Sequence, residues 1–189
     1  MSEKIYLKAQ DLLEDSFRLG AMILASGFRP SIIVALWRGG APIGIAVQEL
    51  LAYANIDTDH IAIRTSSYQG VDGRASEVKV HDMSYLIKTV RYEDRLLIVD
   101  DVFDTGLTID GVIKQLRERT RLNTPHDIRV AVPYYKPARS RTDRIPDYFI
   151  HETMSWLKYP HSLEGLSPDE VRQHRPRLYD IIKAHLPTS

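Results

Sequence analysis

Residues 96–108 read LLIVDDVFDTGLT, and this stretch decides how the rest of the chain is interpreted. Its leading apolar run, LLIV, predicts a strand buried on both faces, because strands of a covered parallel sheet are continuously apolar rather than alternating. A polar turn then leads into apolar residues at the i, i+3, i+4 and i+7 positions of an amphipathic helix, which are Ile109, Val112, Ile113 and Leu116. Strand, turn and helix in this order predict part of a β-α-β unit.

The same alternation continues in both directions along the chain. Short apolar runs predict further strands at residues 32–36, 60–65, 128–132 and 148–150. A helix is predicted at residues 43–53, and an earlier helix, ended by Gly27 and Pro30, has apolar residues at helical spacing: Leu13, Phe17, Ala21 and Leu24. The polar, glycine-containing stretch at residues 66–77, SSYQGVDGRASE, predicts a long loop, and long loops in compact domains are usually mobile, functional or both.

A final helix is predicted near the end of the printed sequence. Ser167, Pro168 and Glu170 have the spacing of an N-cap, a proline in the first turn and the partner of a capping box. We expect the buried face of this helix to consist of Leu178, Ile181 and Ile182.

Together these elements predict an α/β protein, in which a parallel, twisted sheet is flanked by helices on both faces and joined by right-handed crossovers. Ligands of such sheets bind beyond the carboxyl ends of the strands. Functional residues are therefore expected in the segments that follow Leu36, Thr65, Val99 and Val132.

Length and composition exclude several classes of protein. A chain of 189 residues fits one domain, and the absence of cysteine excludes disulfides and thiolate metal sites. Because 25 basic residues balance 25 acidic ones, no long-range field favours nucleic acid or an anionic membrane as a partner. Acidic residues near the N-terminus argue against a signal peptide, and no apolar stretch approaches the roughly 18 residues of a membrane span. We expect a cytoplasmic protein without a nucleic-acid or membrane partner.

The turn after Val99 carries the strongest chemical signal. Two adjacent carboxylates, Asp100 and Asp101, can accept hydrogen bonds from a diol or bind Mg²⁺ directly or through water. A glycine between threonines at the start of a helix suits a phosphate, because free amides and the helix dipole converge there. Helix capping needs one Asp or Thr, whereas this turn has five: Asp100, Asp101, Asp104, Thr105 and Thr108.

The stretch LLIVDDVFDTGLT resembles the signature of the type I phosphoribosyltransferases, which bind 5-phosphoribosyl-1-pyrophosphate (PRPP). The resemblance implies that Asp100 and Asp101 hold the ribose hydroxyls. It implies that the 5-phosphate is bound by Thr105, Gly106, Leu107 and Thr108. In purine members the aspartate before T-G lies near N7 of the base and acts as a general base, a role that falls on Asp104.

Two earlier stretches agree with this family. ALWRGGAPIG, residues 35–44, is similar to the pyrophosphate loop, with Arg38 before Gly39 and Gly40. Backbone amides approach an anion closely where side chains are absent, and Arg38 adds a fixed positive charge. RTSSYQG, residues 64–70, is similar to the start of the flexible loop of 6-oxopurine members, which implies that Ser67 and Tyr68 close over the reaction centre.

The later stretches bear on the base. YYKPARS, residues 134–140, resembles the segment with the purine-recognition lysine, so Lys136 would donate to O6 and reject adenine. SWLKYP, residues 155–160, resembles the bacterial xanthine-guanine type, which implies that Trp156 stacks on the purine and that backbone groups of Leu157 contact its edge. Relatives carry an aspartate shortly after that proline. This chain has Glu164 there instead, and whether it replaces the aspartate stays open.

The resemblance spans about residues 30–160. We expect one domain over residues 1–189, with a core at about 28–135, a small base-binding hood at about 136–166 and a C-terminal helix at about 168–186. The implied reaction transfers phosphoribose from PRPP to a 6-oxopurine, with hypoxanthine or guanine favoured, in purine salvage. Mg²⁺ is the implied cofactor, held at Asp100 and Asp101 through ribose or water, with Glu164 as a further candidate ligand. A homodimer or homotetramer is expected. The alternatives are a xanthine-preferring enzyme and a regulator that senses PRPP or nucleotides.

Overall fold

A computed structural model of the chain describes residues 4–68, 77–81 and 83–185. The chain divides into two compact units. The larger unit comprises Gln10–Met154, and the smaller unit comprises Met1–Ala9 together with Ser155–Ser189. The expectation that the whole chain acts as one domain stays a prediction.

The larger unit is built on a mostly parallel sheet. Seven strands of the described residues form it in the order β4-β3-β2-β5-β7-β6, with β8 paired to β7. The strands are β2 (Ile32–Trp37), β3 (Asp59–Tyr68), β4 (Glu77–His81), β5 (Arg95–Val99), β6 (Val102–Phe103), β7 (Asp127–Tyr135) and β8 (Tyr148–Glu152). Among these pairings β3 with β4 is antiparallel and the others are parallel. The predicted fold class is confirmed.

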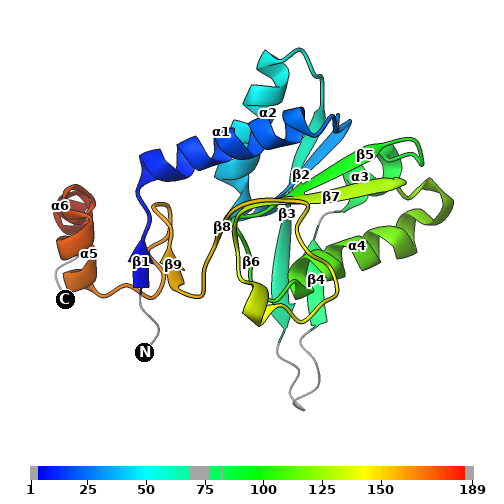
Figure 1. Ribbon diagram of the computed structural model, residues 1–189. Helices are drawn as coiled ribbons and strands as arrows, with labels where there is room; N and C mark the ends of the chain where they lie inside the picture. Colours follow the sequence, from blue (N-terminus) through cyan, green and yellow to red (C-terminus); the bar gives the residue numbers. More distant parts are fainter. Residues whose placement is uncertain (1–3, 69–76, 82, 186–189) are drawn as a thin grey trace. The chain divides into compact units, whose positions relative to one another are not determined.

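Helices cover both faces of this sheet (Figure 1). α1 (Ala9–Ala25) and α2 (Gly40–Tyr53) lie on one face, and α3 (Ser84–Thr89) and α4 (Leu107–Thr120) pack on the other. Short 3₁₀ turns follow α4 (Arg121–Asn123) and β7 (Pro137–Arg139). The apolar face predicted for α4 is confirmed, because all four of its residues are buried against the strands. The apolar runs of β2 and β5 are buried throughout, as expected for a sheet covered on both sides.

The first predicted helix is present as α1, but the apolar residues whose spacing predicted it do not form its buried face. Leu13 is 44% exposed and Phe17 is 39% exposed, whereas Leu12, Leu19 and Ile23 are buried. A Cβ at Gly20 would lie 2.9 Å from the end of the Leu50 side chain of α2, so the two helices approach each other closely at that glycine. The buried face of α1 includes the small residues Ser16 and Gly20. The spacing of large apolar residues alone indicated the adjacent face.

The stretch predicted as one long loop is partly strand. Ser66, Ser67 and Tyr68 belong to β3 and Glu77 begins β4, and the two strands pair by backbone hydrogen bonds. Such pairing does not require apolar side chains, which is why their absence suggested a loop. Residues 69–76 of that stretch lie outside the described residues.

The smaller unit contains β1 (Lys4–Tyr6), which pairs in parallel with β9 (Trp156–Lys158), and the helices α5 (Pro168–His174) and α6 (Pro176–His185). The predicted N-cap and capping box at Ser167 are confirmed. The prediction of a single final helix is wrong. Pro176 disfavours a helical conformation of Arg175, so the segment forms two helices, α5 and α6. None of the described residues of α6 is buried, so its predicted apolar face, Leu178, Ile181 and Ile182, is not a buried one. No described helix has the length and apolar character needed to cross a membrane.

Candidate functional site

Three segments singled out in the sequence follow strands whose carboxyl ends lie at one edge of the sheet. β2, β5 and β7 are neighbours in parallel register, with Ala35 opposite Val99 and Val99 opposite Ala131. Residues 38–40, 100–108 and 136–140 come directly after these strands. The parallel register therefore gathers the three segments at one end of the larger unit.

Asp100 and Asp101 lie next to each other after β5. The backbone N–H of Asp101 donates to the Asp100 carboxylate at 2.9 Å. Burial, followed by the charge of Asp101, raises the pKa of Asp100 well above its usual value. Burial also raises the pKa of Asp101 to about 6, opposed by a hydrogen bond from Asp100 and by the charge of Arg38. A cation or hydrogen-bond donors would stabilise such carboxylates, so the pair suits a diol or a metal ion.

The segment after β2 lies directly against this acidic pair. A Cβ added to Gly39 would be 2.0 Å from Oδ2 of Asp101, and one added to Gly40 would be 2.3 Å from the carbonyl oxygen of Val99. Gly39 has ordinary helical dihedral angles (φ −63°, ψ −36°), so the backbone conformation does not demand glycine there. Glycine is needed there because the backbone lies so close to the carboxylate of Asp101. The Arg-Gly-Gly segment and the acidic pair thus form one continuous surface.

The turn predicted to bind phosphate leads from β6 into α4. Thr105 and Gly106 form the turn, and Leu107 and Thr108 are the first residues of the helix. Gly106 adopts a φ of +77°, and a Cβ there would lie 2.8 Å from the Phe103 ring. Backbone amides of a first helical turn have no acceptor within the helix. Together with the helix dipole they make this turn suited to an anion.

Asp104 and Lys136 are in contact, although they are 32 residues apart in the sequence. Nζ of Lys136 lies 3.4 Å from Oδ2 of Asp104, and Lys136 is 4% exposed. The other carboxylate oxygen accepts a hydrogen bond from Nε of Arg139. The backbone N–H of Lys136 donates to the carbonyl of Phe103 at 2.9 Å, which anchors the lysine beside the acidic turn. A buried donor and an acceptor therefore stand side by side.

A family model described as "Phosphoribosyl transferase domain" matches residues 2–166 of this chain. The chain belongs to the phosphoribosyltransferase family. The resemblance expected from the acidic turn is confirmed at the level of the family. No curated protein is significantly similar to the chain in sequence.

Several solved structures share the fold of this chain. A purine phosphoribosyltransferase from Pyrococcus horikoshii superposes with a TM-score of 0.68 at 24% identity, over 87% of this chain and 97% of that chain. A hypothetical protein from Neisseria gonorrhoeae with bound ppGpp gives 0.69 at 22% identity, over 96% and 98%. The xanthine-guanine-hypoxanthine phosphoribosyltransferase of Helicobacter pylori gives 0.63 at 15% identity, over 98% and 100%. At these identities the similarity establishes the fold.

The acidic pair of this phosphoribosyltransferase fits the needs of Mg²⁺. No group of three or more His, Cys, Asp or Glu residues within the described ranges is placed to hold a metal ion. Mg²⁺ is commonly bound by one or two carboxylates together with substrate phosphates, so a complete protein cage is not required. Asp100 and Asp101, which are partly buried, could supply the two hard oxygen ligands that this mode needs.

The predicted closing residues lie at the end of β3 in this phosphoribosyltransferase. Ser67 pairs with Val78 and Tyr68 pairs with Glu77 across the β3–β4 ribbon. The loop that joins the two strands, residues 69–76, lies outside the described residues. The closing role of Ser67 and Tyr68 stays a prediction.

The residues predicted to read the base beyond Lys136 belong to the smaller unit. Trp156 and Leu157 lie in β9, opposite Lys4 and Ile5 of β1. The carbonyl of Glu164 accepts a hydrogen bond from Nζ of Lys158 at 3.1 Å. Base stacking by Trp156, edge contacts by Leu157 and metal binding by Glu164 stay predictions, as does the expected oligomer.

Arg139 is a site residue that the sequence reasoning missed. It bonds Asp104 from the end of the 3₁₀ turn Pro137–Arg139, whose N-cap is Lys136. Side chains three residues apart in a 3₁₀ turn point the same way. The spacing of Lys136 and Arg139 in KPAR was therefore a usable signal that both cations approach the same carboxylate.

Proposed function

We propose that this chain transfers the 5-phosphoribosyl group of PRPP to a 6-oxopurine, hypoxanthine or guanine, and releases pyrophosphate in purine salvage. The observation that carries the proposal is the contact between the buried ammonium of Lys136 and the carboxylate of Asp104. It places a donor beside an acceptor next to the acidic pair of a phosphoribosyltransferase.

This donor and acceptor match one edge of a 6-oxopurine. O6 and position 7 lie on the same edge of the base. Lys136 has donors only, so it suits an acceptor such as O6. Asp104 suits an N–H at position 7. Adenine carries an amino group at position 6, which would set a donor against the ammonium of Lys136, so adenine is expected to be a poor substrate.

In the proposed reaction the bond from C1 of PRPP to the pyrophosphate oxygen breaks, and a bond from N9 of the base forms to C1. The proton leaves N7 for Asp104, which acts as general base while Lys136 fixes O6. Arg38 balances negative charge on the departing pyrophosphate, an electrostatic role that often dominates catalysis. The hydrogen bond from Arg139 to Asp104 must give way when the base occupies the carboxylate.

We propose Mg²⁺ as the cofactor, held by Asp100 and Asp101 together with oxygens of PRPP. Bound there, the ion would supply positive charge to the pyrophosphate and ribose oxygens. The ribose hydroxyls are the other proposed partners of the pair, and the turn at residues 105–108 is the proposed seat of the 5-phosphate.

Steady-state assays of PRPP with hypoxanthine, guanine, xanthine and adenine test the proposal directly. Turnover with hypoxanthine or guanine above the other two is the expected result. Preference for xanthine would indicate the narrower alternative enzyme. Adenine as the best substrate would refute the role of Lys136.

Asp104→Asn tests the general base. Asparagine keeps an acceptor for Lys136 but binds no proton, so turnover should fall by about 10²–10⁴-fold. KM for PRPP should stay close to that of the wild type. Asp101→Asn is the matched comparison and should weaken PRPP binding instead. Equal losses of turnover and PRPP affinity in Asp104→Asn would contradict the assignment.

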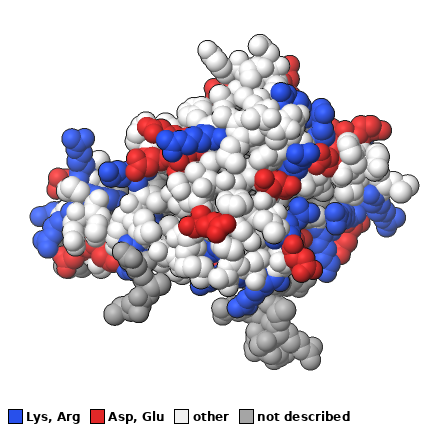
Figure 2. All heavy atoms as spheres, viewed as in Figure 1, with Lys and Arg blue, Asp and Glu red and all other residues white. Residues whose placement is uncertain are grey.

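A regulator that senses a nucleotide is the second candidate, favoured by one observation. The Neisseria protein of the same fold has bound ppGpp, a guanine nucleotide with pyrophosphate groups. Basic and acidic side chains are interspersed on the face shown in Figure 2, and the net charge is zero, so a nucleic-acid partner has no electrostatic support. Binding of ppGpp without turnover of any base would favour this candidate over the enzyme.

A further inference from the structure

The loop that follows β9 in the smaller unit is held by cations on its backbone carbonyls. Lys158, a buried residue at the end of β9, donates from Nζ to the carbonyl of Glu164 at 3.1 Å and to that of Gly165 at 3.3 Å. These bonds close residues 159–165 into a compact loop that begins and ends near the same ammonium group. The shape of the loop thus depends on a buried charge.

Arg175 holds the other side of this loop. Its Nη1 donates to the carbonyls of Ser162 at 2.7 Å and Pro160 at 3.4 Å. Its Nη2 donates to the carbonyls of Tyr159 at 2.6 Å and Lys158 at 3.5 Å. The planar guanidinium is suited to this task, because its N–H donors diverge in a fixed fork. One side chain therefore fixes four carbonyls within five consecutive residues.

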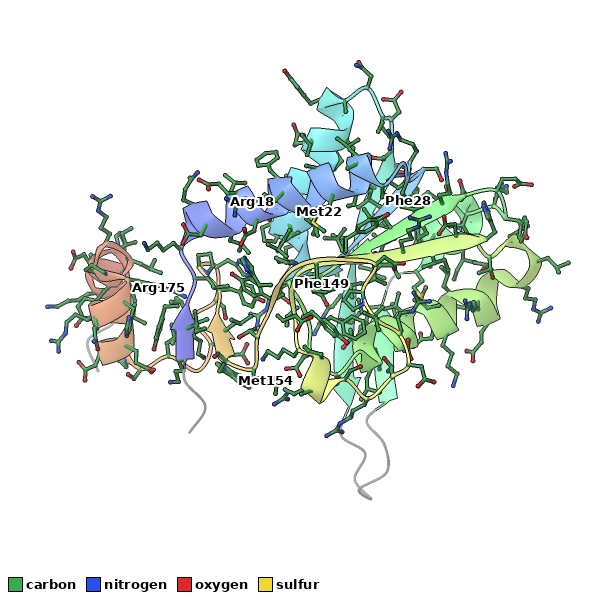
Figure 3. The ribbon with its side chains drawn as sticks, viewed as in Figure 1. Arg18, Met22, Phe28, Phe149, Met154 and Arg175 are labelled. Carbon is green, nitrogen blue, oxygen red and sulfur yellow. The ribbon has the colours of Figure 1, made fainter. Side chains whose placement is uncertain are left out.

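Arg175 is itself held in position by the start of the chain. It lies at the end of α5, on the side towards β1 (Figure 3). The ring of the preceding residue, His174, stacks on Tyr6 of β1 with centroids 3.6 Å apart. The hydroxyl of Tyr6 donates to Glu170 of α5 at 2.9 Å. Because β1 pairs with β9, the arginine is tied to the strand that precedes the loop it holds.

The partners of Arg175 point to a role in shape rather than in charge pairing. The four acceptors are neutral carbonyls, and burial lowers the pKa of Arg175. Losing the guanidinium would remove these bonds and leave residues 159–162 less constrained, whereas the carbonyl of Lys158 would still accept from the N–H of Leu7 at 3.0 Å. Trp156 and Leu157 come directly before that segment, so movement of the loop would displace them. Arg175 also lies beyond residue 166, where the match to the family model ends.

We propose that Arg175 is a positioning residue for purine recognition, which fixes the backbone beside Trp156 and Leu157 and so sets the affinity for the base. This inference rests on the proposed function and on the prediction from the sequence that Trp156 and Leu157 contact the base. Arg175 touches no substrate in this role. It acts through the four carbonyls that it holds.

The test compares steady-state constants of the full chain with hypoxanthine and PRPP varied separately. Arg175→Gln removes the charge and the fork. KM for the base should rise at least tenfold, because displacements of about 1 Å in a positioning group cost about that much or more. KM for PRPP and kcat at saturating base should change less than twofold. Arg175→Lys keeps the charge without the fork, and it should give a smaller rise in KM for the base.

The matched control is Arg172→Gln, which removes the same charge three residues earlier, within α5. Arg172 is exposed and bonds Asp169 three residues away, so both KM values should stay at the wild-type level. An unchanged KM for the base in Arg175→Gln, equal changes in both KM values, or a loss of fold in Arg175→Lys by circular dichroism would overturn the inference. Absence of wild-type turnover with every base would instead show that the proposed function had failed, and the inference with it.

Discussion

Gly39→Ala tests whether the acidic pair depends on close approach of the segment after β2. The added Cβ would lie 2.0 Å from Oδ2 and 2.2 Å from Cγ of Asp101, whereas ordinary contact begins at 3.4 Å. The carboxylate would have to shift by about 1.4 Å to restore ordinary contact. Misplacing a group at an active site by about 1 Å can cost about 10²-fold in rate. We expect kcat/KM for PRPP to fall by about 100-fold, equivalent to about 2.7 kcal/mol.

The stability of the variant should fall much less than its kcat/KM, and this separates the effect from unfolding. Gly39 has helical dihedral angles that alanine adopts readily, so the substitution limits the unfolded chain and favours folding by about 0.4–1 kcal/mol. That gain offsets part of the strain at Asp101. Urea unfolding should give a midpoint close to that of the wild type, while PRPP titration at saturating hypoxanthine shows the loss.

Gly20→Ala is the matched control for this test. Its Cβ would meet the flexible end of Leu50 at 2.9 Å, on α1 and away from the three strand ends, so kcat/KM should not change. Wild-type kcat/KM for PRPP in Gly39→Ala would refute the argument, because it would show that Asp101 can move without functional loss.

Two further predictions concern charges in the two units. Lys136→Gln should lower kcat/KM for hypoxanthine by about 10- to 100-fold, the value of a hydrogen bond from a charged group, with KM for PRPP unchanged; an equal loss for both substrates would contradict the assignment. A hydrogen bond from Lys4 leads the causes that lower the pKa of Glu170 to about 2, so its stabilising effect is complete above about pH 4.5 and is lost as the pH falls through about 2. In urea unfolding followed by Trp156 fluorescence in a Trp37→Phe background, the stability difference between the wild type and Glu170→Gln should therefore shrink as the pH falls from 4.5 to 2; a constant difference would contradict this.

The parts of the fold that could be predicted are those fixed by local periodicity. The apolar run at 96–99 and the helix behind it have a single consistent interpretation, and both are buried as expected. The face of α1 could not be predicted in the same way, because it depends on the fit of Gly20 against Leu50 of another helix. The antiparallel pairing of β3 with β4 was missed because it depends on backbone hydrogen bonds, and these require no pattern of apolar residues in the sequence.

The residues of the candidate site also fall into those that sequence motifs predicted and those that only the structure reveals. Motifs placed Asp104 and Lys136 after different strands, and parallel register explains why they meet. Arg139 was missed because its partner is set by a 3₁₀ turn that the sequence analysis did not identify. Arg175 was missed for a deeper reason. It bonds backbone carbonyls 13 to 17 residues away, and carbonyls are present in every residue, so no sequence pattern marks them.

The carboxylates of the acidic turn lie in two different electrostatic environments, although all of them lie within residues 100–104. Asp104 is ion-paired with Lys136 and Arg139, which hold its carboxylate in a fixed orientation. Asp100 and Asp101 are desolvated beside each other, and the pKa of each is raised. Carboxylates that differ in this way are suited to different tasks. In the free protein the two neighbouring carboxylates of Asp100 and Asp101 repel each other when both are charged. A ligand that brings hydroxyl donors and a cation would reduce this repulsion. Asp104 already has two cationic partners, so its environment agrees with the separate role proposed for it above.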